Sequence, residues 1–290
     1  MQSDANRRGG RVIGAMLLAA SAIVVAGMAS AGTLDTVRQA GVVRLAYRED
    51  APPFSFKGSD GQPTGYTVAL CRAVVAGLKD QLKLAKLTVQ YVPVTSVNRF
   101  EAMQNNQADM LCEATSETLS RRKIVDFSIP TFISGASLII RADGPTSLRE
   151  MDGKKIGVLA GTTTEQSLNE SLKQAAVNAE VIPVKTHQEG MQMVGNGGVS
   201  AYFADRTILQ YLQRTSNAPN LMLADNYLTY EPYALALPHG DGDFRLAVDR
   251  VLSDLYRSGQ IESIFVQSFG KEAKATPILS YLYVISGLPE

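Results

Sequence analysis

The sequence contains no tryptophan and has only two histidines and two cysteines in 290 residues. His187 and His239 are far apart along the chain, and no cysteine stands near either of them. A zinc site draws several such ligands from short spacings, so we expect no metal and no cofactor. Without tryptophan, ligand binding has to be followed by calorimetry or by tyrosine emission.

The two cysteines, Cys71 and Cys112, leave one question open. In an oxidising compartment they can form one disulfide, but two buried thiols fit the sequence equally well. The sequence does not decide between these alternatives.

Long apolar runs are also lacking, except at the N-terminus. Arg7, Arg8 and Arg11 precede an apolar run over residues 12–27, which the small residues Ala29-Ser30-Ala31 follow. This order predicts a signal peptide over residues 1–31. A membrane anchor is the alternative, but the apolar core is at the short end for a bilayer span. No cysteine at the boundary offers a site for a lipid, so we expect a soluble periplasmic protein.

An excess of charge of one sign is absent as well. The 28 basic and 28 acidic side chains balance, and removal of three arginines and one aspartate with residues 1–31 leaves 25 basic and 27 acidic side chains. A net charge near zero argues against nucleic acid or an anionic membrane surface as the partner.

Short apolar segments alternate with amphipathic ones along most of the remaining chain. Strands separated by helices are typical of parallel sheets that are covered on both faces, so the expected fold class is α/β. The predicted strands are residues 42–46, 87–92, 155–159 and 181–184, and the predicted helices are residues 66–78, 97–105, 163–174 and 187–194.

Two extended apolar segments, residues 130–141 and 227–237, suggest that the chain crosses twice between two lobes. If these segments run side by side, the second lobe is an insertion in the first. We predict that residues 32–135 and 232–290 form lobe 1 and that residues 136–231 form lobe 2.

Three arginines stand where a predicted strand gives way to a loop or a helix. Arg48 follows the first strand, Arg99 lies in the first turn of a helix that Ser96 is expected to cap, and Arg121 ends a predicted helical turn over residues 116–121. Ligands bind at the carboxyl ends of strands in α/β sheets. Guanidinium groups bind carboxylates through paired hydrogen bonds, so the three arginines predict a carboxylate pocket. Three separate surface ion pairs are the alternative.

Two further segments are candidates for ligand contact. Gly161-Thr162-Thr163 leads from a strand into a helix, and Thr162 and Glu165 form a capping pattern. Such a helix start suits an anion, although an ordinary cap is the alternative. Asp205 opens another helix, where it is either an N-cap or the partner of a ligand ammonium group.

These residues stand in the same order as in a known family. The chain resembles the periplasmic binding proteins of polar amino-acid ABC importers, nearest the glutamate/aspartate-binding branch. The resemblance implies a type II periplasmic-binding fold, in which two α/β lobes are joined by two hinge strands and close on a ligand cleft. The matching segments are residues 47–56, Gly65-Tyr66, residues 95–99, residues 114–116 with Arg121, residues 125–128, residues 161–164, His187, Asp205 and residues 231–233.

The resemblance also implies roles for single residues. Arg121, with residues 161–163, would hold the α-carboxylate, and Asp205 would hold the α-ammonium group. Arg48, Arg99 and His187 match positions that recognise the second carboxylate of an acidic amino acid. The remaining residues of the implied ligand site are Ser96, Ala114, Ser116, Thr162 and Thr163.

The chain departs from the family pattern beside this site. Glu113 stands where glycine is expected and Ala114 where serine is usual. The three arginines exceed Glu113 and Asp205 by one charge, which fits an anionic ligand. If Glu113 turns inward, however, it neutralises an arginine, and a neutral polar amino acid fits instead.

The predicted function is that of a monomeric, non-catalytic receptor that binds an acidic or polar amino acid and delivers it to the membrane permease of an ABC importer. One alternative is a periplasmic enzyme on the same scaffold, resembling the cyclohexadienyl dehydratases, with Glu113 and His187 as candidate general acids. Another alternative is a ligand-binding sensor module.

Overall fold

The structure is a computed structural model that describes residues 32–216, 218–225 and 227–290. The predicted signal peptide of residues 1–31 lies outside the described residues. Within the described part of the chain, no helix is both long enough and apolar enough to cross a bilayer.

The first of two five-stranded sheets has the strand order β5-β1-β6-β15-β7. Its second strand, β1 (Val42–Arg48), runs parallel to its neighbours β5 (Thr88–Val94) and β6 (Met110–Leu111). β15 (Ala236–Leu237) pairs antiparallel with β6 and with β7 (Asp126–Phe127), so a distant segment completes this sheet. A small sheet follows β1 and contains β2 (Asp50–Ala51), β3 (Ser55–Lys57) and β4 (Pro63–Thr64).

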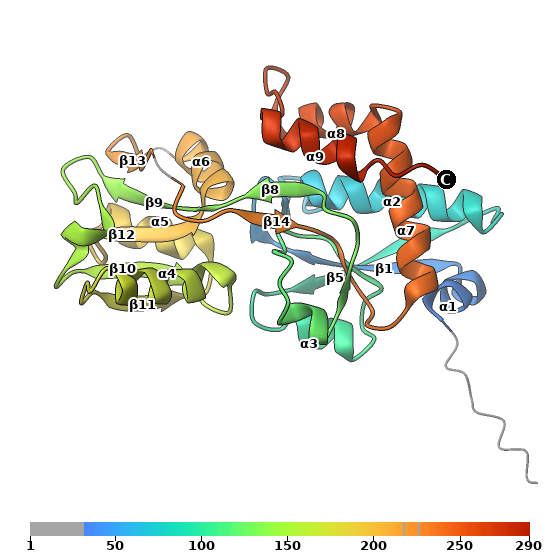
Figure 1. Cartoon of the computed structure of the whole chain (residues 1–290), viewed down its shortest axis with the longest axis horizontal. Helices are drawn as coiled ribbons and strands as arrows, with labels where there is room; N and C mark the ends of the chain where they lie inside the picture. Colours follow the sequence, from blue (N-terminus) through green and yellow to red (C-terminus); the bar gives the residue numbers. More distant parts are fainter. Residues whose placement is uncertain (1–31, 217, 226) are drawn as a thin grey trace, which may run out of the picture. The chain divides into compact units, whose positions relative to one another are not determined.

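Helices from both ends of the described chain accompany this sheet (Figure 1). They are α1 (Thr33–Ala40), α2 (Tyr66–Gln81), α3 (Arg99–Gln104), α7 (Gly242–Arg257), α8 (Gln260–Phe269) and α9 (Pro277–Ser286). A short 3-10 helix, η1 (Arg121–Lys123), precedes β7.

The second five-stranded sheet has the order β11-β10-β12-β9-β13. β10 (Lys155–Leu159) runs parallel to β11 (Glu180–Val184) and β12 (Ala201–Asp205), whereas β9 (Ala136–Arg141) pairs antiparallel with β12 and β13 (Leu221–Leu223). Its helices are η2 (Leu148–Met151), α4 (Thr163–Gln174), α5 (His187–Gly195) and α6 (Arg206–Thr215). The two sheets with their helices form the two α/β lobes of the predicted fold class.

Two strands connect the lobes. β8 (Phe132–Ser134) and β14 (Glu231–Tyr233) pair antiparallel, with Ile133 opposite Pro232, and they run side by side between the sheets (Figure 1). We call this pair the hinge ladder. The predicted lobe boundary at residues 135/136 lies just after β8, and the one at residues 231/232 lies within β14, after its first residue. The domain assignment itself stays a prediction.

Two local expectations were wrong. Asn98 and not Ser96 stands at the N-cap of α3, and Asn98 Oδ1 accepts a hydrogen bond from the backbone N–H of Thr95 at 2.7 Å, which closes a turn before the helix. Residues 116–121 do not form a helical turn, because Ser116 bridges Tyr233 and the Glu117 N–H donates to the Pro232 carbonyl. The hinge ladder thus holds this segment extended, and the helical turn begins only at Arg121.

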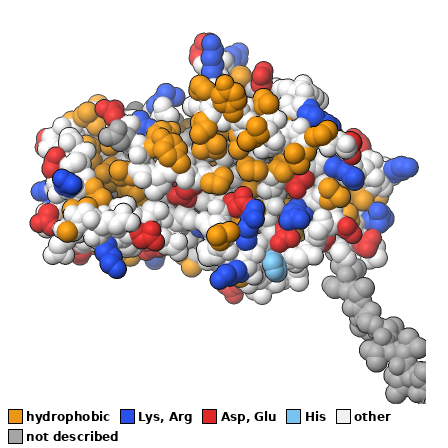
Figure 2. All heavy atoms as spheres, viewed as in Figure 1, with side chains coloured by type: hydrophobic (Ala, Val, Ile, Leu, Met, Phe, Trp, Pro, Cys, Tyr) orange, Lys and Arg blue, Asp and Glu red, His pale blue; other side chains and the backbone are white. Residues whose placement is uncertain are grey.

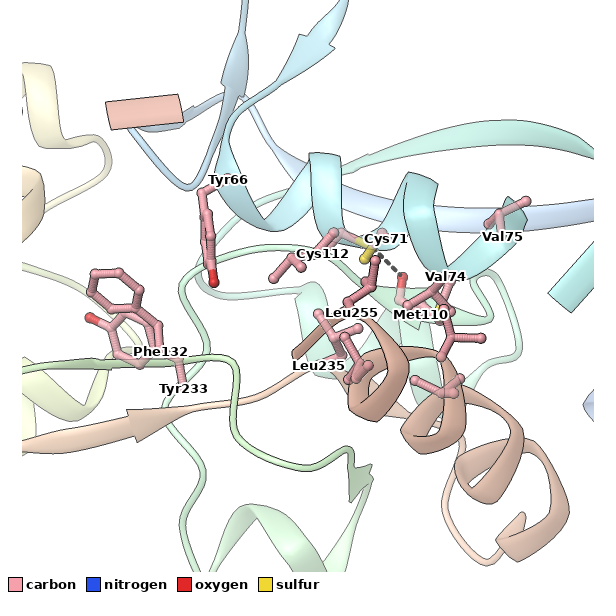
Figure 3. Packing of buried hydrophobic residues seen from close by; sticks show 14 of the residues in the cluster. Tyr66, Cys71, Val74, Val75, Met110, Cys112, Phe132, Tyr233, Leu235 and Leu255 are labelled. Atoms are coloured by element: carbon pink, nitrogen blue, oxygen red, sulfur yellow. Dashed lines mark hydrogen bonds between the residues drawn. A yellow bond between two sulfur atoms is a disulfide. The ribbon is translucent and has the colours of Figure 1, made fainter. Parts of the chain in front are cut away.

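A cluster of aromatic rings anchors the hinge ladder to the core of the first lobe (Figure 3). Phe54 packs edge-to-face against Tyr66, Phe132 and Tyr233, with ring centroids 4.9–6.3 Å apart. Full burial stabilises each such side chain by about 1.5–3 kcal/mol. Since Phe132 and Tyr233 belong to β8 and β14, this packing fixes both strands against α2.

The open question of the cysteines is answered, because Cys71 and Cys112 form a disulfide (Figure 3). Cys71 lies on α2, and Cys112 directly follows β6. The bond therefore ties the end of β6, from which Glu113 and Ala114 continue, to the helix that covers the sheet.

The C-terminal helix α9 exposes apolar side chains, among them Tyr281, Val284 and Ile285. Hydrophobic side chains gather where α8 and α9 lie (Figure 2). Between these helices, α6 and the hinge ladder lies a surface groove of about 1140 Å³. This groove is larger than the pocket between the lobes, which is described below. Its charged lining residues, Arg214 and Lys274, are exposed to solvent.

We expect reduction of the disulfide to lower the free energy of unfolding by about 2–4 kcal/mol, because the cross-link limits the unfolded chain over a separation of 41 residues. Urea unfolding with and without reductant measures this difference. The double variant Cys71→Ser/Cys112→Ser should match the reduced protein and should not respond to reductant. Equal stability of the oxidised and reduced wild-type proteins would contradict the prediction.

Candidate functional site

A pocket of about 310 Å³ lies between the two lobes. Nine of the ten residues of the predicted ligand site line it, and Ser96 does not. The lining residues are Arg48, Arg99, Ala114, Ser116, Arg121, Leu159, Thr162, Thr163, His187, Asp205 and Ile208.

Ser96 is buried behind the pocket wall. Its carbonyl oxygen accepts a hydrogen bond from an Arg99 Nη1–H, and Arg99 Nη2 donates to the Gly161 carbonyl at 3.3 Å. Ser96 thus helps to position the Arg99 guanidinium, and a contact with the ligand stays a prediction for this residue.

Arg121 reaches the pocket from the start of η1. Its Nη1 donates to the Ser116 carbonyl at 2.7 Å, and its guanidinium lies over the Phe100 ring at 5.0 Å from the centroid. Within the described residues it forms no ion pair, although burial lowers its pKa from the ordinary arginine value. The Glu113, Glu231 and Asp205 carboxylates act in the opposite direction on this pKa. A half-buried guanidinium that forms no direct ion pair among the described residues favours an anionic ligand at this position.

Arg99 is paired with Glu113. Arg99 Nε lies 2.9 Å from Glu113 Oε1, which also accepts a hydrogen bond from Thr115 Oγ1 at 2.7 Å. The Nε–H does not point along the line between the two atoms, so the contact is an ion pair rather than an aligned hydrogen bond. Burial lowers the pKa of Arg99 to about 10, and the Glu113 carboxylate acts in the opposite direction. Glu113 therefore turns inward, which answers a question that the sequence left open.

Arg48 is paired with Asp50. Arg48 Nε and Nη2 lie 2.9 and 2.6 Å from Asp50 Oδ1, and the second carboxylate oxygen accepts from the backbone N–H of His187 at 3.4 Å. Because Asp50 belongs to the first lobe and His187 begins α5 in the second, this carboxylate contacts both lobes. Arg48 Nη1 also lies 3.8 Å from Glu113 Oε2.

His187 is fully buried beside Arg48. Burial, reinforced by the positive charge of Arg48, lowers its pKa to about 3, so the ring is neutral at pH 7. Its Nδ1 lies 2.8 Å from the Tyr202 hydroxyl, while Nε2 has no hydrogen-bond partner within the described residues.

Asp205 stands at the position before α6, but among the described residues its side chain does not bond to the first turn of the helix. Instead its carboxylate accepts a hydrogen bond from the Tyr233 hydroxyl of the hinge ladder. Burial, with the nearby Glu231 carboxylate as second cause, raises the pKa of Asp205 to about 7. A cation beside Asp205 would favour the ionised form.

The turn before α4 completes the pocket. Thr162 caps the helix by accepting from the Glu165 N–H at 3.2 Å, and Glu165 returns a bond to the Gly161 N–H at 2.8 Å. Thr163 Oγ1 lies 3.1 Å from Ser116 Oγ in the other lobe. Gly161 has a φ of 74°, and a Cβ there would lie 3.1 Å from the Ser96 carbonyl, so this close approach of the lobes requires glycine.

The sequence did not predict Leu159, Ile208 and Asp50 at the site. The first two are apolar lining residues with no chemical signature. Asp50 carried a weak signal, since Arg48 and Asp50 are two residues apart in an extended segment and therefore point to the same side. No cluster of three or more potential metal ligands occurs in the described part of the chain.

The chain is similar to known proteins in sequence and in fold. Residues 43–271 match the bacterial extracellular solute-binding proteins, family 3. The L-glutamate/L-aspartate-binding protein of Pseudomonas aeruginosa is 30% identical over 243 residues, which are 82% of this chain and 80% of that protein. A glutamate/glutamine/aspartate/asparagine-binding protein of Rhodobacter capsulatus is 30% identical over 78% of this chain and 67% of its own length.

Among solved structures, an ancestral amino acid-binding protein, described as a precursor of cyclohexadienyl dehydratase, superposes with a TM-score of 0.72 at 26% identity. The match covers 82% of this chain and 99% of that chain. With the family match over most of its length, the two-lobed fold and the pocket between the lobes, this chain belongs to family 3 of the bacterial extracellular solute-binding proteins.

Proposed function

We propose that this chain is the substrate-binding component of an ABC importer for amino acids with acidic or polar side chains, and that it works in the periplasm. The observation that carries the proposal is the pairing of two complementary groups in one pocket. Arg121 is a half-buried guanidinium that forms no direct ion pair in the described chain, and Asp205 is a carboxylate whose ionisation burial opposes. The α-carboxylate and α-ammonium groups of an amino acid supply the two missing charges.

The mechanism follows from the origin of these two groups. Arg121 comes from the first lobe and Asp205 from the second, so one zwitterion contacts both lobes only when they approach each other. Ligand binding then shifts the population toward the closed form. The direct contacts between Ser116 and Thr163 and between Arg99 and Gly161 add to this closure.

The relatives support the ligand class and the partner. Their printed names describe proteins that bind glutamate and aspartate, or these together with glutamine and asparagine. For this chain we propose the corresponding cycle, in which the closed, loaded form docks on a membrane permease and releases its ligand there unchanged. Export by a cleaved signal peptide over residues 1–31 and a monomeric state belong to the same proposal.

Catalysis receives less support from the site. A general acid has to carry a proton near neutral pH, whereas the pKa of His187 is lowered to about 3 by burial. The other candidate, Glu113, is buried in an ion pair with Arg99 and is not among the residues that line the pocket. We therefore expect no turnover of cyclic carboxylic acids.

Replacement of Arg121 by alanine should weaken amino-acid binding at least about 100-fold, because it removes the guanidinium that meets the α-carboxylate. Isothermal titration calorimetry measures the change. The neighbouring Arg122→Ala variant is the matched control, since that side chain is exposed and pairs with Glu117 on the surface. Its Kd should stay within about twofold of the wild type. Equal affinities of the two variants would contradict the proposed role of Arg121.

Amino-acid affinity should fall as the pH drops from 7 to 5. Asp205 has a raised pKa of about 7 without ligand, and the ligand ammonium group lowers it, so binding below pH 7 releases a proton. We expect the Kd to rise by up to about tenfold per pH unit in this range. His187 does not contribute, because its pKa is about 3.

Calorimetry in two buffers that differ in ionisation enthalpy counts the released protons. The Asp205→Asn variant should bind more weakly and should lose both the pH dependence and the proton release. An affinity that is constant between pH 5 and pH 8 in the wild type would show that Asp205 does not face the ligand ammonium group.

A further inference from the structure

The three arginines of the pocket differ in their partners. Arg48 and Arg99 are each in contact with a carboxylate of the chain itself, whereas Arg121 forms no ion pair in the described part of the chain. The pocket therefore offers one guanidinium, that of Arg121, without a direct ion pair among the described residues. A ligand with one carboxylate satisfies it, and a second ligand carboxylate finds both remaining guanidinium groups already neutralised.

Asp50 takes the position in which a second ligand carboxylate would bind. Its Oδ1 accepts from Arg48 Nε and Nη2, and its Oδ2 accepts from the His187 N–H at the start of α5. Cationic side chains and helix N-termini are the two groups that bind anions in such sites. The chain thus supplies its own carboxylate between them.

Glu113 provides a second carboxylate that balances the charges of Arg99 and Arg48. Its Oε1 is 2.9 Å from Arg99 Nε, and its Oε2 is 3.8 Å from Arg48 Nη1. All four side chains are buried or nearly so, with exposed fractions of 4% for Arg48, 24% for Asp50, 3% for Arg99 and 0% for Glu113. Two positive and two negative charges cancel here, so a ligand carboxylate would meet two like charges at short range, which disfavours it.

Two polar atoms at this end still lack partners. The Tyr202 hydroxyl has only His187 Nδ1 as an acceptor among the described residues, so it donates to Nδ1 and leaves the ring proton on Nε2. Among the described residues, Nε2–H of His187, which lines the pocket, then has no acceptor, and Glu113 Oε2 accepts no hydrogen bond although it lies in an ion pair with Arg48. A carboxamide carries both an acceptor oxygen and a donor NH2 group, whereas a carboxylate carries acceptors alone.

We propose that the site selects amino acids with an amide side chain, glutamine or asparagine, over the corresponding acids, and that Asp50 and Glu113 are the specificity-determining residues. The proposal rests on the function proposed above, because it assumes that Arg121 and Asp205 hold the main-chain groups of an amino acid. It narrows the acidic or polar class to neutral, amide-bearing ligands.

Other side chains fit this end of the pocket less well. A cationic ligand side chain would face the guanidinium groups of Arg48 and Arg99. An apolar one would leave His187 Nε2, which lines the pocket, buried without a hydrogen-bond partner, which is unfavourable.

Titration calorimetry of the full mature protein, freed of bound ligand, with four amino acids tests the proposal. We expect the wild type to bind glutamine at least about tenfold more tightly than glutamate, or asparagine at least about tenfold more tightly than aspartate. Asp50→Asn removes the carboxylate that is paired with the Arg48 guanidinium, and Glu113→Gln removes the one that is paired with Arg99. Each variant should therefore shift the amide-to-acid affinity ratio toward the acid by at least about tenfold.

Glu49→Gln is the matched control. Glu49 precedes Asp50, but its carboxylate contacts the Tyr47 hydroxyl at 3.1 Å and Lys57 Nζ at 3.5 Å, away from the arginines. Its affinity ratio should equal that of the wild type. Thermal unfolding confirms that each variant folds, and the partly exposed Asp50 provides the test if loss of the buried Glu113 charge prevents folding.

The outcomes separate this proposal from the proposed function. A wild type that prefers the acids, or that binds a different polar amino acid in their place, overturns the amide assignment and leaves amino-acid binding intact. An amide preference that neither Asp50→Asn nor Glu113→Gln changes overturns the role of these two residues. Absence of binding to every amino acid overturns the proposed function itself, and the amide assignment with it.

Discussion

A guanidinium group that is buried away from water needs a counter-charge, and this need organises the pocket between the lobes. The chain meets it for Arg48 with Asp50 and for Arg99 with Glu113. Arg121 alone of the three has no direct ion pair in the described part of the chain, and we propose that a ligand carboxylate meets it. The same electrostatic requirement thus explains both parts of the pocket. Arg48 and Arg99 are paired with carboxylates of the described chain, and Arg121 is not.

The fold brings these charges together from segments that are distant in sequence. Arg48 ends β1, Glu113 follows β6, and Asp205 ends β12 in the other sheet. The hinge ladder connects the two sheets, and its Tyr233 donates a hydrogen bond to Asp205 while its ring packs against Phe54. A single residue, Tyr233, therefore links the aromatic core, the hinge ladder and the Asp205 carboxylate. The disulfide at Cys112 secures the neighbouring strand end.

Much of the fold and most of the site could be predicted from the sequence. The helix over residues 163–174 and the strand over residues 155–159 were predicted at their actual bounds, because apolar periodicity and the Thr162 cap are local signals. The arginines and Asp205 were found because charged residues at strand ends are conspicuous, whereas His187 was predicted only from the resemblance to the binding-protein family. Their convergence in one pocket followed from the parallel arrangement of the strands.

The error at the Ser96 cap is local, because Asn98 stands at the N-cap of α3 instead, whereas the other errors depend on side-chain positions and on contacts between distant segments. The expected helical turn over residues 116–121 is absent because Ser116 pairs with Tyr233 of the hinge ladder. The pairing of Asp50 and Glu113 with the arginines depends on side-chain positions that periodicity does not specify. The net charge of the pocket, and with it the nature of the ligand, was for this reason the least predictable property.

An experimental structure of the protein with its co-purified ligand tests the central claim most directly. The account predicts one small molecule between the lobes, with its carboxylate within about 3 Å of the Arg121 guanidinium and its ammonium group within about 3 Å of the Asp205 carboxylate. A ligand whose carboxylate instead binds Arg48 or Arg99 in place of Asp50 or Glu113, with Arg121 turned away from it, would contradict the account.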